Sequence, residues 1–207
     1  MTAGHREQPY LQPYLKAART HGAGFESLLW ASPDTQAARF DAIQRIVDLD
    51  GKSVLDLGCG RADLLDFLLA HGIRPADYVG IEAVDALADA AERKRLPRCT
   101  IRRADFVADP IRMFVGADVV VISGSLNTAD DSAFYPTLRH AFEAATDALV
   151  FNFLDSDRLA GQPHLYFREP RAVRTFAQTL SADVTMLDDY LPGDTTVRVA
   201  REREGEA

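Results

Sequence analysis

The chain has 207 residues, of which 47% are hydrophobic and 26% charged, as is usual for a globular protein with one buried core. Its 31 acidic residues outnumber the 23 basic ones and give a net charge of −8. This balance disfavours nucleic acids and anionic membrane surfaces as partners, because both would repel the chain.

No segment of the sequence has the features of a targeting or membrane-spanning element. Residues 1–14 lack a basic stretch followed by an apolar core, and no later segment approaches the ~20 apolar residues that cross a bilayer. We therefore expect a cytoplasmic protein. Cys59 and Cys99 are too far apart for a paired zinc motif, so we expect two reduced thiols and no metal site.

The first fifty residues predict a helical arm ahead of the main domain. Residues 9–20 favour a weak helix, because Pro9 and Pro13 restrict where it begins. Ser32 is an expected N-cap and Pro33 the first residue of a second helix that runs to residue 47. We interpret residues 1–50 as an arm or lid, 51–201 as the core and 202–207 as a solvated tail.

The core alternates short apolar runs with amphipathic stretches, as βαβ units do. Strands are predicted at residues 54–57, 78–81, 99–103, 118–122 and 148–154, with helices at 62–70 and 85–95 and a last one from 170 to 180. Asp85 is the expected cap of the second helix. Residues 184–190 and 195–200 flank a turn and predict a hairpin. The fold class is therefore α/β, a doubly wound and mostly parallel sheet of seven strands with a C-terminal antiparallel hairpin.

Two glycines follow the first predicted strand and mark a possible ligand site. At Gly58 and Gly60 a ligand can lie against backbone N–H groups and the positive end of the next helix, although a tight turn without a ligand has the same pattern. Asp63 stands where a dinucleotide-binding loop has its third glycine, and its carboxylate would repel a pyrophosphate. The ammonium and sulfonium groups of S-adenosylmethionine suit Asp63 and Asp56 better.

Acidic residues also end the second and third predicted strands. Glu82 is placed to accept hydrogen bonds from the two hydroxyls of a ribose, and Asp105 from an adenine amino group. The ring of Phe106 would cover the purine. The alternatives are a solvated acid at Glu82, and a loop acid beside a core phenylalanine at Asp105 and Phe106.

The motif formed by Asp56, Gly58 and Gly60, with Ala62 in place of a further glycine, resembles that of the class I S-adenosylmethionine-dependent methyltransferases. The resemblance covers residues 52–200 and implies a Rossmann-like methyltransferase fold, S-adenosylmethionine as cofactor and S-adenosylhomocysteine as product. It places the methionine moiety at Gly58 and Gly60, the ribose at Glu82, and the adenine at Asp105 and Phe106. Cys59 and Ala83 are further expected cofactor contacts.

A second, less specific pattern resembles small bacterial methyltransferases of this class. It consists of Trp30, Gln36 and residues 39–40, followed by residues 123–127 after the fourth strand. The resemblance implies that Arg39 pairs with the cofactor carboxylate, which a guanidinium suits, whereas an exposed helix arginine is the alternative. Ser123 and Gly124 are expected cofactor contacts. Ser125 and Asn127 are expected to contact cofactor or acceptor.

Methyl transfer from a sulfonium needs mainly orientation, because the leaving group departs as a neutral thioether. If the acceptor must lose a proton, candidate bases are His140, His164, Tyr166 and Tyr190, of which we favour His164; we also include Asn127 among the catalytic residues.

A small molecule is the favoured acceptor. The chain has no Asp/Asn-Pro-Pro-Tyr sequence, which is typical of methyltransferases that modify nucleobase amino groups. We therefore predict a small-molecule methyltransferase that is a monomer or homodimer. A non-catalytic module that binds an adenosyl ligand and an NAD-dependent oxidoreductase are the alternatives.

Overall fold

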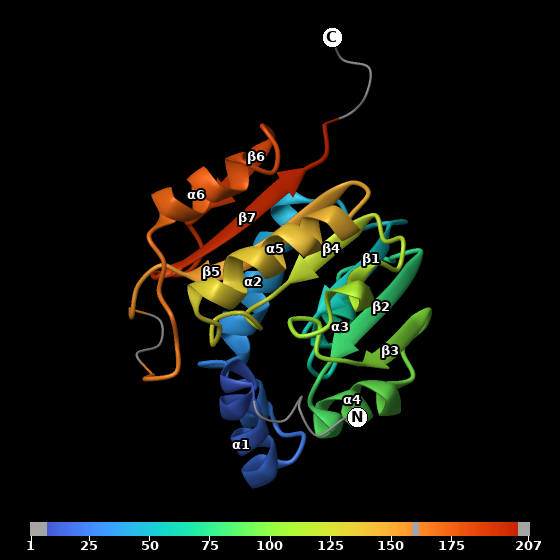
Figure 1. Cartoon of the computed structure of the whole chain (residues 1–207). Coiled ribbons are helices and arrows are strands. Elements are labelled where there is room, and N and C mark those ends of the chain that lie inside the picture. Colours follow the sequence, from blue (N-terminus) through green and yellow to red (C-terminus); the bar gives the residue numbers. More distant parts are fainter. Residues whose placement is uncertain (1–7, 159–161, 203–207) are drawn as a thin grey trace.

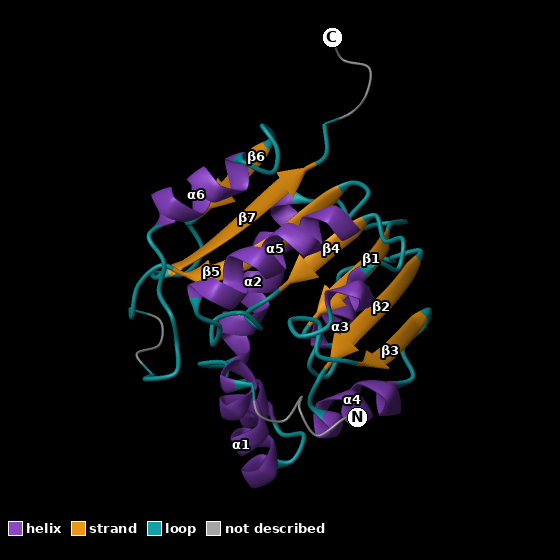
Figure 2. Ribbon diagram, in the orientation of Figure 1, coloured by secondary structure: helices purple, strands orange, loops and turns teal. Residues whose placement is uncertain are grey.

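A single seven-stranded sheet forms the centre of the protein (Figures 1 and 2). The computed structural model describes residues 8–158 and 162–202. The strand order is β3-β2-β1-β4-β5-β7-β6, with all neighbours parallel except β5–β7 and β7–β6. The predicted fold class is thus confirmed. The strands are β1 (Ser53–Leu57), β2 (Asp77–Glu82), β3 (Cys99–Arg103), β4 (Val119–Ile122), β5 (Ala148–Leu154), β6 (Val184–Leu187) and β7 (Asp194–Ala200).

Helices cover both faces of the sheet because the central strands bury alternate side chains on opposite sides. Val54 packs with Phe40 on one face, whereas its neighbour Leu55 packs with Phe134 on the other. The first face carries α2 (Pro33–Ile46), α3 (Asp63–Ala70) and α4 (Asp85–Lys94), and the second carries η4 (Pro110–Met113), α5 (Asp131–Ala144) and α6 (Pro170–Gln178).

The N-terminal segment lies across the carboxyl ends of the parallel strands (Figure 1). It consists of η2 (Pro9–Leu11), α1 (Gln12–His21) and η3 (Phe25–Leu28). Tyr14 and Trp30 pack beside Val84 and Leu87 of the loop after β2 and the start of α4. The predicted weak helix at residues 9–20 is therefore a short 3₁₀ turn followed by an α-helix. Residues 1–7, and the predicted tail apart from Glu202, lie outside the described residues.

Three local predictions were wrong in detail. Asp85 is the first residue of α4 rather than its cap, a position taken by Val84. The helix predicted from Ala62 begins one residue later, because Ala62 lies in the left-handed region at φ +56°, a conformation that suits a glycine at this position of the motif. The strand predicted at 184–190 ends at Leu187, because the chain then turns and directs the hydroxyl of Tyr190 toward Asp194.

Among the described residues no helix is long and apolar enough to cross a membrane.

Helix α2 begins at a capping box, in which Ser32 is the N-cap that the sequence predicts. The Ser32 Oγ accepts a hydrogen bond from the backbone N–H of Thr35 at 3.2 Å, and the Thr35 Oγ1 accepts one from the N–H of Ser32 at 3.1 Å. Pro33 occupies the first turn, where its missing N–H leaves no bond unmade. The box fixes the start of the helix that carries Arg39.

We predict that Ser32→Ala lowers the free energy of unfolding by about 1 kcal/mol, because an N–H at the helix start loses its acceptor. Urea denaturation followed by circular dichroism measures the change. Ser32→Thr retains a hydroxyl and should stay within about 0.5 kcal/mol of the wild type. Equal losses in the two variants would contradict the role of the cap.

Candidate functional site

A cavity opens at the carboxyl edge of the sheet, beneath the N-terminal segment. It encloses about 960 Å³ of empty space, including its open mouth. The structure brings together here all the residues predicted to bind the cofactor, and Asn127 with them. These lining residues are Arg39, Asp56, Gly58, Cys59, Gly60, Glu82, Ala83, Asp105, Phe106, Ser123 and Gly124.

The glycine loop after β1 is held in place by its neighbours. Gly58 has a φ of +76°, and a Cβ there would lie 2.3 Å from the Cβ of Ser125. Ser125 in turn donates a 2.7 Å hydrogen bond to the carbonyl of Leu57. A side chain at residue 58 would therefore both strain the backbone and displace the loop after β4.

Glu82 joins the loops after β1 and β2. One oxygen of its buried carboxylate accepts the N–H of Gly60 at 2.8 Å, and the other accepts the N–H of Val84 at 2.8 Å. Burial raises the pKa of Glu82 to about 7, although both N–H groups favour the ionised form.

Asp56 is a second buried acid in the cavity wall. Burial raises its pKa to about 7, while the hydroxyl of Tyr78 donates a hydrogen bond to its Oδ2. Asp63, in contrast, forms ion pairs with Arg61 at 3.0 Å and Lys94 at 2.5 Å. Its charge is therefore already balanced by two basic side chains, unlike the charges of Asp56, Glu82 and Asp105.

Asp105 is bound by the N-terminal segment. Its carboxylate accepts the hydroxyl of Tyr10 at 2.9 and 3.0 Å, and the backbone N–H groups of Val107 and Ala108 at 3.1 Å. Burial and the neighbouring Asp105 raise the pKa of Tyr10, so that it stays a neutral donor. Phe106 is buried beside this group.

Arg39 is buried rather than exposed on its helix. Its Nε donates to Asp194 Oδ2 at 2.7 Å, and its Nη2 donates to the same oxygen. The guanidinium carbon lies 4.6 Å from the centre of the Trp30 ring. Its Nη1 makes no hydrogen bond with the described residues and lies beside Gly124. One edge of the guanidinium is thus held, and one nitrogen remains at the cavity wall.

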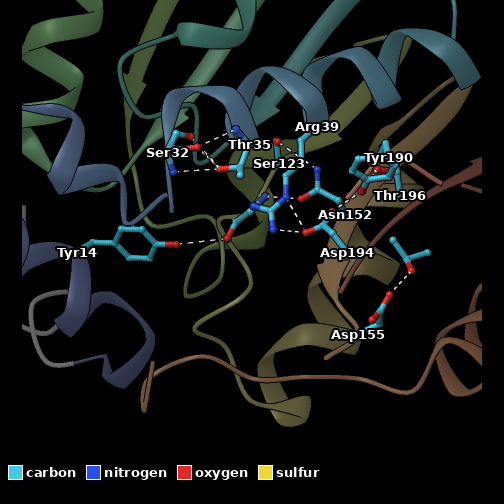
Figure 3. Close-up of polar contacts among 12 residues, drawn as sticks. Tyr14, Ser32, Thr35, Arg39, Ser123, Asn152, Asp155, Tyr190, Asp194 and Thr196 are labelled. Atoms are coloured by element: carbon cyan, nitrogen blue, oxygen red, sulfur yellow. Dashed lines mark hydrogen bonds and ion pairs between the residues drawn. The ribbon is translucent and has the colours of Figure 1, made fainter. Parts of the chain in front are cut away.

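The loop after β4 depends on Asn152, a residue that sequence reasoning did not single out. Its side-chain oxygen accepts the N–H of Gly124 at 2.8 Å, and its amide donates to the Ser123 Oγ at 3.3 Å. Tyr14 donates to the carbonyl of Gly124 at 3.3 Å (Figure 3). Asn152 is the single polar side chain in the otherwise apolar strand β5, which is a signal that the sequence carries.

The candidate bases are placed differently from the cofactor residues. Among the described residues, Leu165 lines the cavity but His164 does not. Burial lowers the pKa of the half-buried His164, so that its imidazole is neutral near pH 7. His140 lies on α5, away from the cavity, and Tyr190 is bound to Asp194. Asn127 lines the cavity, and its buried Oδ1 has no partner among the described residues.

The sequence is similar to that of a protein from Mycobacterium tuberculosis (strain ATCC 25618 / H37Rv) named "Putative methyltransferase Rv1506c". The two are 32% identical over 168 residues, which cover 76% of this chain and 98% of the relative. The chain belongs to the same methyltransferase family as this relative. No family model matches the sequence.

Solved structures share the fold of this methyltransferase. The DhpI–S-adenosylhomocysteine complex has a TM-score of 0.68 at 17% identity, covering 97% of this chain and 98% of DhpI. Magnesium protoporphyrin IX methyltransferase (ChlM) from Synechocystis PCC 6803, also with bound S-adenosylhomocysteine, has a TM-score of 0.66 at 14% identity, covering 96% and 97%. A methyltransferase from Archaeoglobus fulgidus has a TM-score of 0.64 at 16% identity, covering 82% and 95%.

The polar groups of the methyltransferase cavity fit S-adenosylmethionine. Carboxylate oxygens of Glu82 and Asp105 suit ribose hydroxyls and an adenine amino group, and the Nη1 of Arg39, which has no acceptor among the described residues, suits a carboxylate. The Oδ1 of Asn127 is a buried acceptor to which no group in residues 8–158 or 162–202 donates. Sequence reasoning did not find Tyr10, Tyr14 or Asp194, because their contacts span from 95 to 155 residues of chain.

We predict that the methyltransferase becomes less stable as the pH rises from about 5 to about 7. The native Glu82 carboxyl keeps its proton up to about pH 7, whereas in the unfolded chain it loses it near pH 4.5, so the native state binds more protons in this window. Asp56 acts in the same direction. Glu82→Gln cannot titrate and should reduce the fall in the free energy of unfolding by about 3 kcal/mol.

Urea denaturation at closely spaced pH values measures this dependence. Glu143→Gln, at an exposed position of α5, serves as the matched control and should leave the pH profile of the wild type unchanged. If Glu82→Gln and Glu143→Gln gave the same profile, the buried carboxyl would not be the titrating group.

Proposed function

We propose that the cavity binds S-adenosylmethionine and that the protein transfers its methyl group to a small-molecule acceptor. The observation that carries this proposal is the convergence of Glu82, Arg39 and the Gly58–Gly60 turn on one cavity. The net charge of −8 supports a small acceptor over a nucleic acid. In this reaction S-adenosylmethionine would supply a methyl group activated by its sulfonium, and the sulfur would leave as a neutral thioether.

The protein's own contribution is mainly to bind and orient. Glu82 would accept the ribose hydroxyls, Asp105 the adenine amino group with Phe106 against the purine, and Arg39 would hold the carboxylate of the methionine moiety. Asp56 and the backbone at Gly58, Cys59 and Gly60 would line the methionine moiety, with Ser123 and Gly124 beside it. Correct orientation of the reactants supplies roughly 7–11 kcal/mol of a barrier of this kind.

The N-terminal segment would act as a lid. Tyr10 reaches Asp105, Tyr14 reaches Gly124, and the carbonyl of Tyr10 accepts the hydroxyl of Thr128 at 2.8 Å. Leu11, Leu28, Leu29 and Trp30 add an apolar wall that excludes water. Opening these few contacts would admit both substrates, whereas α2 stays packed on the sheet.

His164 is the base that we propose for acceptors that lose a proton. It follows β5 and is the neighbour of Leu165, which lines the cavity. Its imidazole is neutral near pH 7. The N–H of Tyr166 donates to the carbonyl of Asn127 at 2.8 Å, which ties this segment to the loop after β4. Asn127 would orient the acceptor beside it.

We predict that Glu82→Ala weakens binding of S-adenosylhomocysteine at least tenfold, because the loss of two hydrogen bonds to a charged group costs more than about 1.4 kcal/mol. Isothermal titration calorimetry at pH 8 measures the dissociation constant. Asp85→Asn, an exposed acid three residues further along, is the control and should bind like the wild type. An unchanged affinity of Glu82→Ala would refute the ribose assignment.

A panel of small acceptors tests turnover through the release of S-adenosylhomocysteine. For an acceptor that is turned over, we predict that His164→Gln lowers kcat by about 10²-fold and leaves the KM for S-adenosylmethionine unchanged, because only proton transfer is lost. A loss below threefold would show that His164 is not the base. Binding without turnover of any acceptor would favour a sensor over an enzyme.

A further inference from the structure

The buried ion pair between Arg39 and Asp194 connects the cavity wall to the C-terminal hairpin (Figure 3). Asp194 is the first residue of β7 and pairs with Leu154, the last residue of β5. Because β7 runs antiparallel to β5, its first residue lies at the carboxyl edge of the sheet, where the ligands of such folds bind. A parallel strand in this position would place its last residue there instead.

Both carboxylate oxygens of Asp194 accept hydrogen bonds from side chains of the protein. Its Oδ2 accepts both donors of Arg39, and its Oδ1 accepts the hydroxyl of Tyr190. The hydroxyl oxygens of Tyr190 and Thr196 are 2.6 Å apart. Since Tyr190 donates its single hydroxyl proton to Asp194, the Thr196 hydroxyl is the donor to Tyr190. Asp194 is fully buried and does not line the cavity.

Arg39, in contrast, is held on three sides and open on one. Asp194 takes its Nε and Nη2, the ring of Trp30 covers a face of the guanidinium, and Gly124 leaves room for Nη1. A Cβ at residue 124 would lie 3.3 Å from Nη1 and from the Trp30 ring. These contacts leave Nη1 as the nitrogen that a ligand can reach.

We infer that Asp194 is a positioning residue, which fixes the Arg39 guanidinium so that its Nη1 binds the carboxylate of the methionine moiety. This inference rests on the proposed function and assigns the C-terminal hairpin a role in cofactor binding. A fixed guanidinium loses less side-chain entropy when a carboxylate binds, so the affinity rises without any new contact from the hairpin.

The experiment compares two ligands that differ in the amino-acid moiety. S-adenosylhomocysteine carries the carboxylate, whereas 5′-methylthioadenosine lacks it and retains the nucleoside. We expect Asp194→Asn to weaken S-adenosylhomocysteine about tenfold and to leave 5′-methylthioadenosine within about twofold of the wild type, as measured by calorimetry. A purely structural loss would weaken both ligands by the same factor, and this result would overturn the inference.

Two further variants complete the test. Asp183→Asn removes the partner of Arg198 in an exposed ion pair of 2.7 Å on the same hairpin, and it should change neither affinity. Tyr190→Phe removes one hydrogen bond from Asp194 and keeps its charge, so it serves if Asp194→Asn does not fold. We expect about a threefold loss for S-adenosylhomocysteine alone in Tyr190→Phe.

The double variant Arg39→Gln/Asp194→Asn should bind S-adenosylhomocysteine no more weakly than Arg39→Gln, because Asp194 acts only through Arg39. Additive losses would overturn the inference. Wild-type protein that binds neither ligand would overturn the proposed function, and the inference with it. Wild-type protein that binds both, with equal losses in the variants, would overturn the inference alone.

Discussion

The hydrogen bonds of the Glu82 carboxylate hold the cavity in shape, because they tie the turn after β1 to the turn after β2. The N–H of Gly60 and the N–H of Val84 both point at this one buried side chain. An apolar residue at position 82 would leave two buried donors without acceptors. The same carboxylate therefore serves the folded chain and faces the cavity, and a ligand that donates hydrogen bonds to it finds its acceptor already fixed.

The raised pKa values of Asp56 and Glu82 relate this geometry to the ligand. Burial favours the neutral form of each carboxyl near pH 7. A ligand that brings positive charge and hydroxyl donors favours the ionised form instead, so binding and proton release are coupled. Asp63 does not take part in this coupling, because Arg61 and Lys94 already neutralise it. This coupling involves the cavity acids that have no basic partner among the described residues.

The sequence predicted the sheet and the edge at which the cavity lies, because both follow from local patterns. Glycines that end a strand, such as Gly58, and an acid that ends the next one, such as Glu82, are recognisable within about thirty residues of chain. The partner of Arg39 was not predictable, since Asp194 is 155 residues away and meets it only when α2 packs against β7. Tyr10 and Asp105 are likewise 95 residues apart, and no periodicity of the sequence indicates that they meet.

The Arg39–Asp194 pair is poorly explained by stability alone. Burying two charges costs several kcal/mol per ion, and a well-packed apolar pair of similar volume is often as stable or more so. Apolar packing is available nearby, since β4 is entirely apolar and β5 is apolar apart from Asn152. What an apolar pair cannot provide is a guanidinium nitrogen at the cavity wall. A buried guanidinium needs a buried acid to balance its charge and to fix its position, and the antiparallel entry of β7 places such an acid beside it. The hairpin that closes the sheet thereby completes the site at its carboxyl edge.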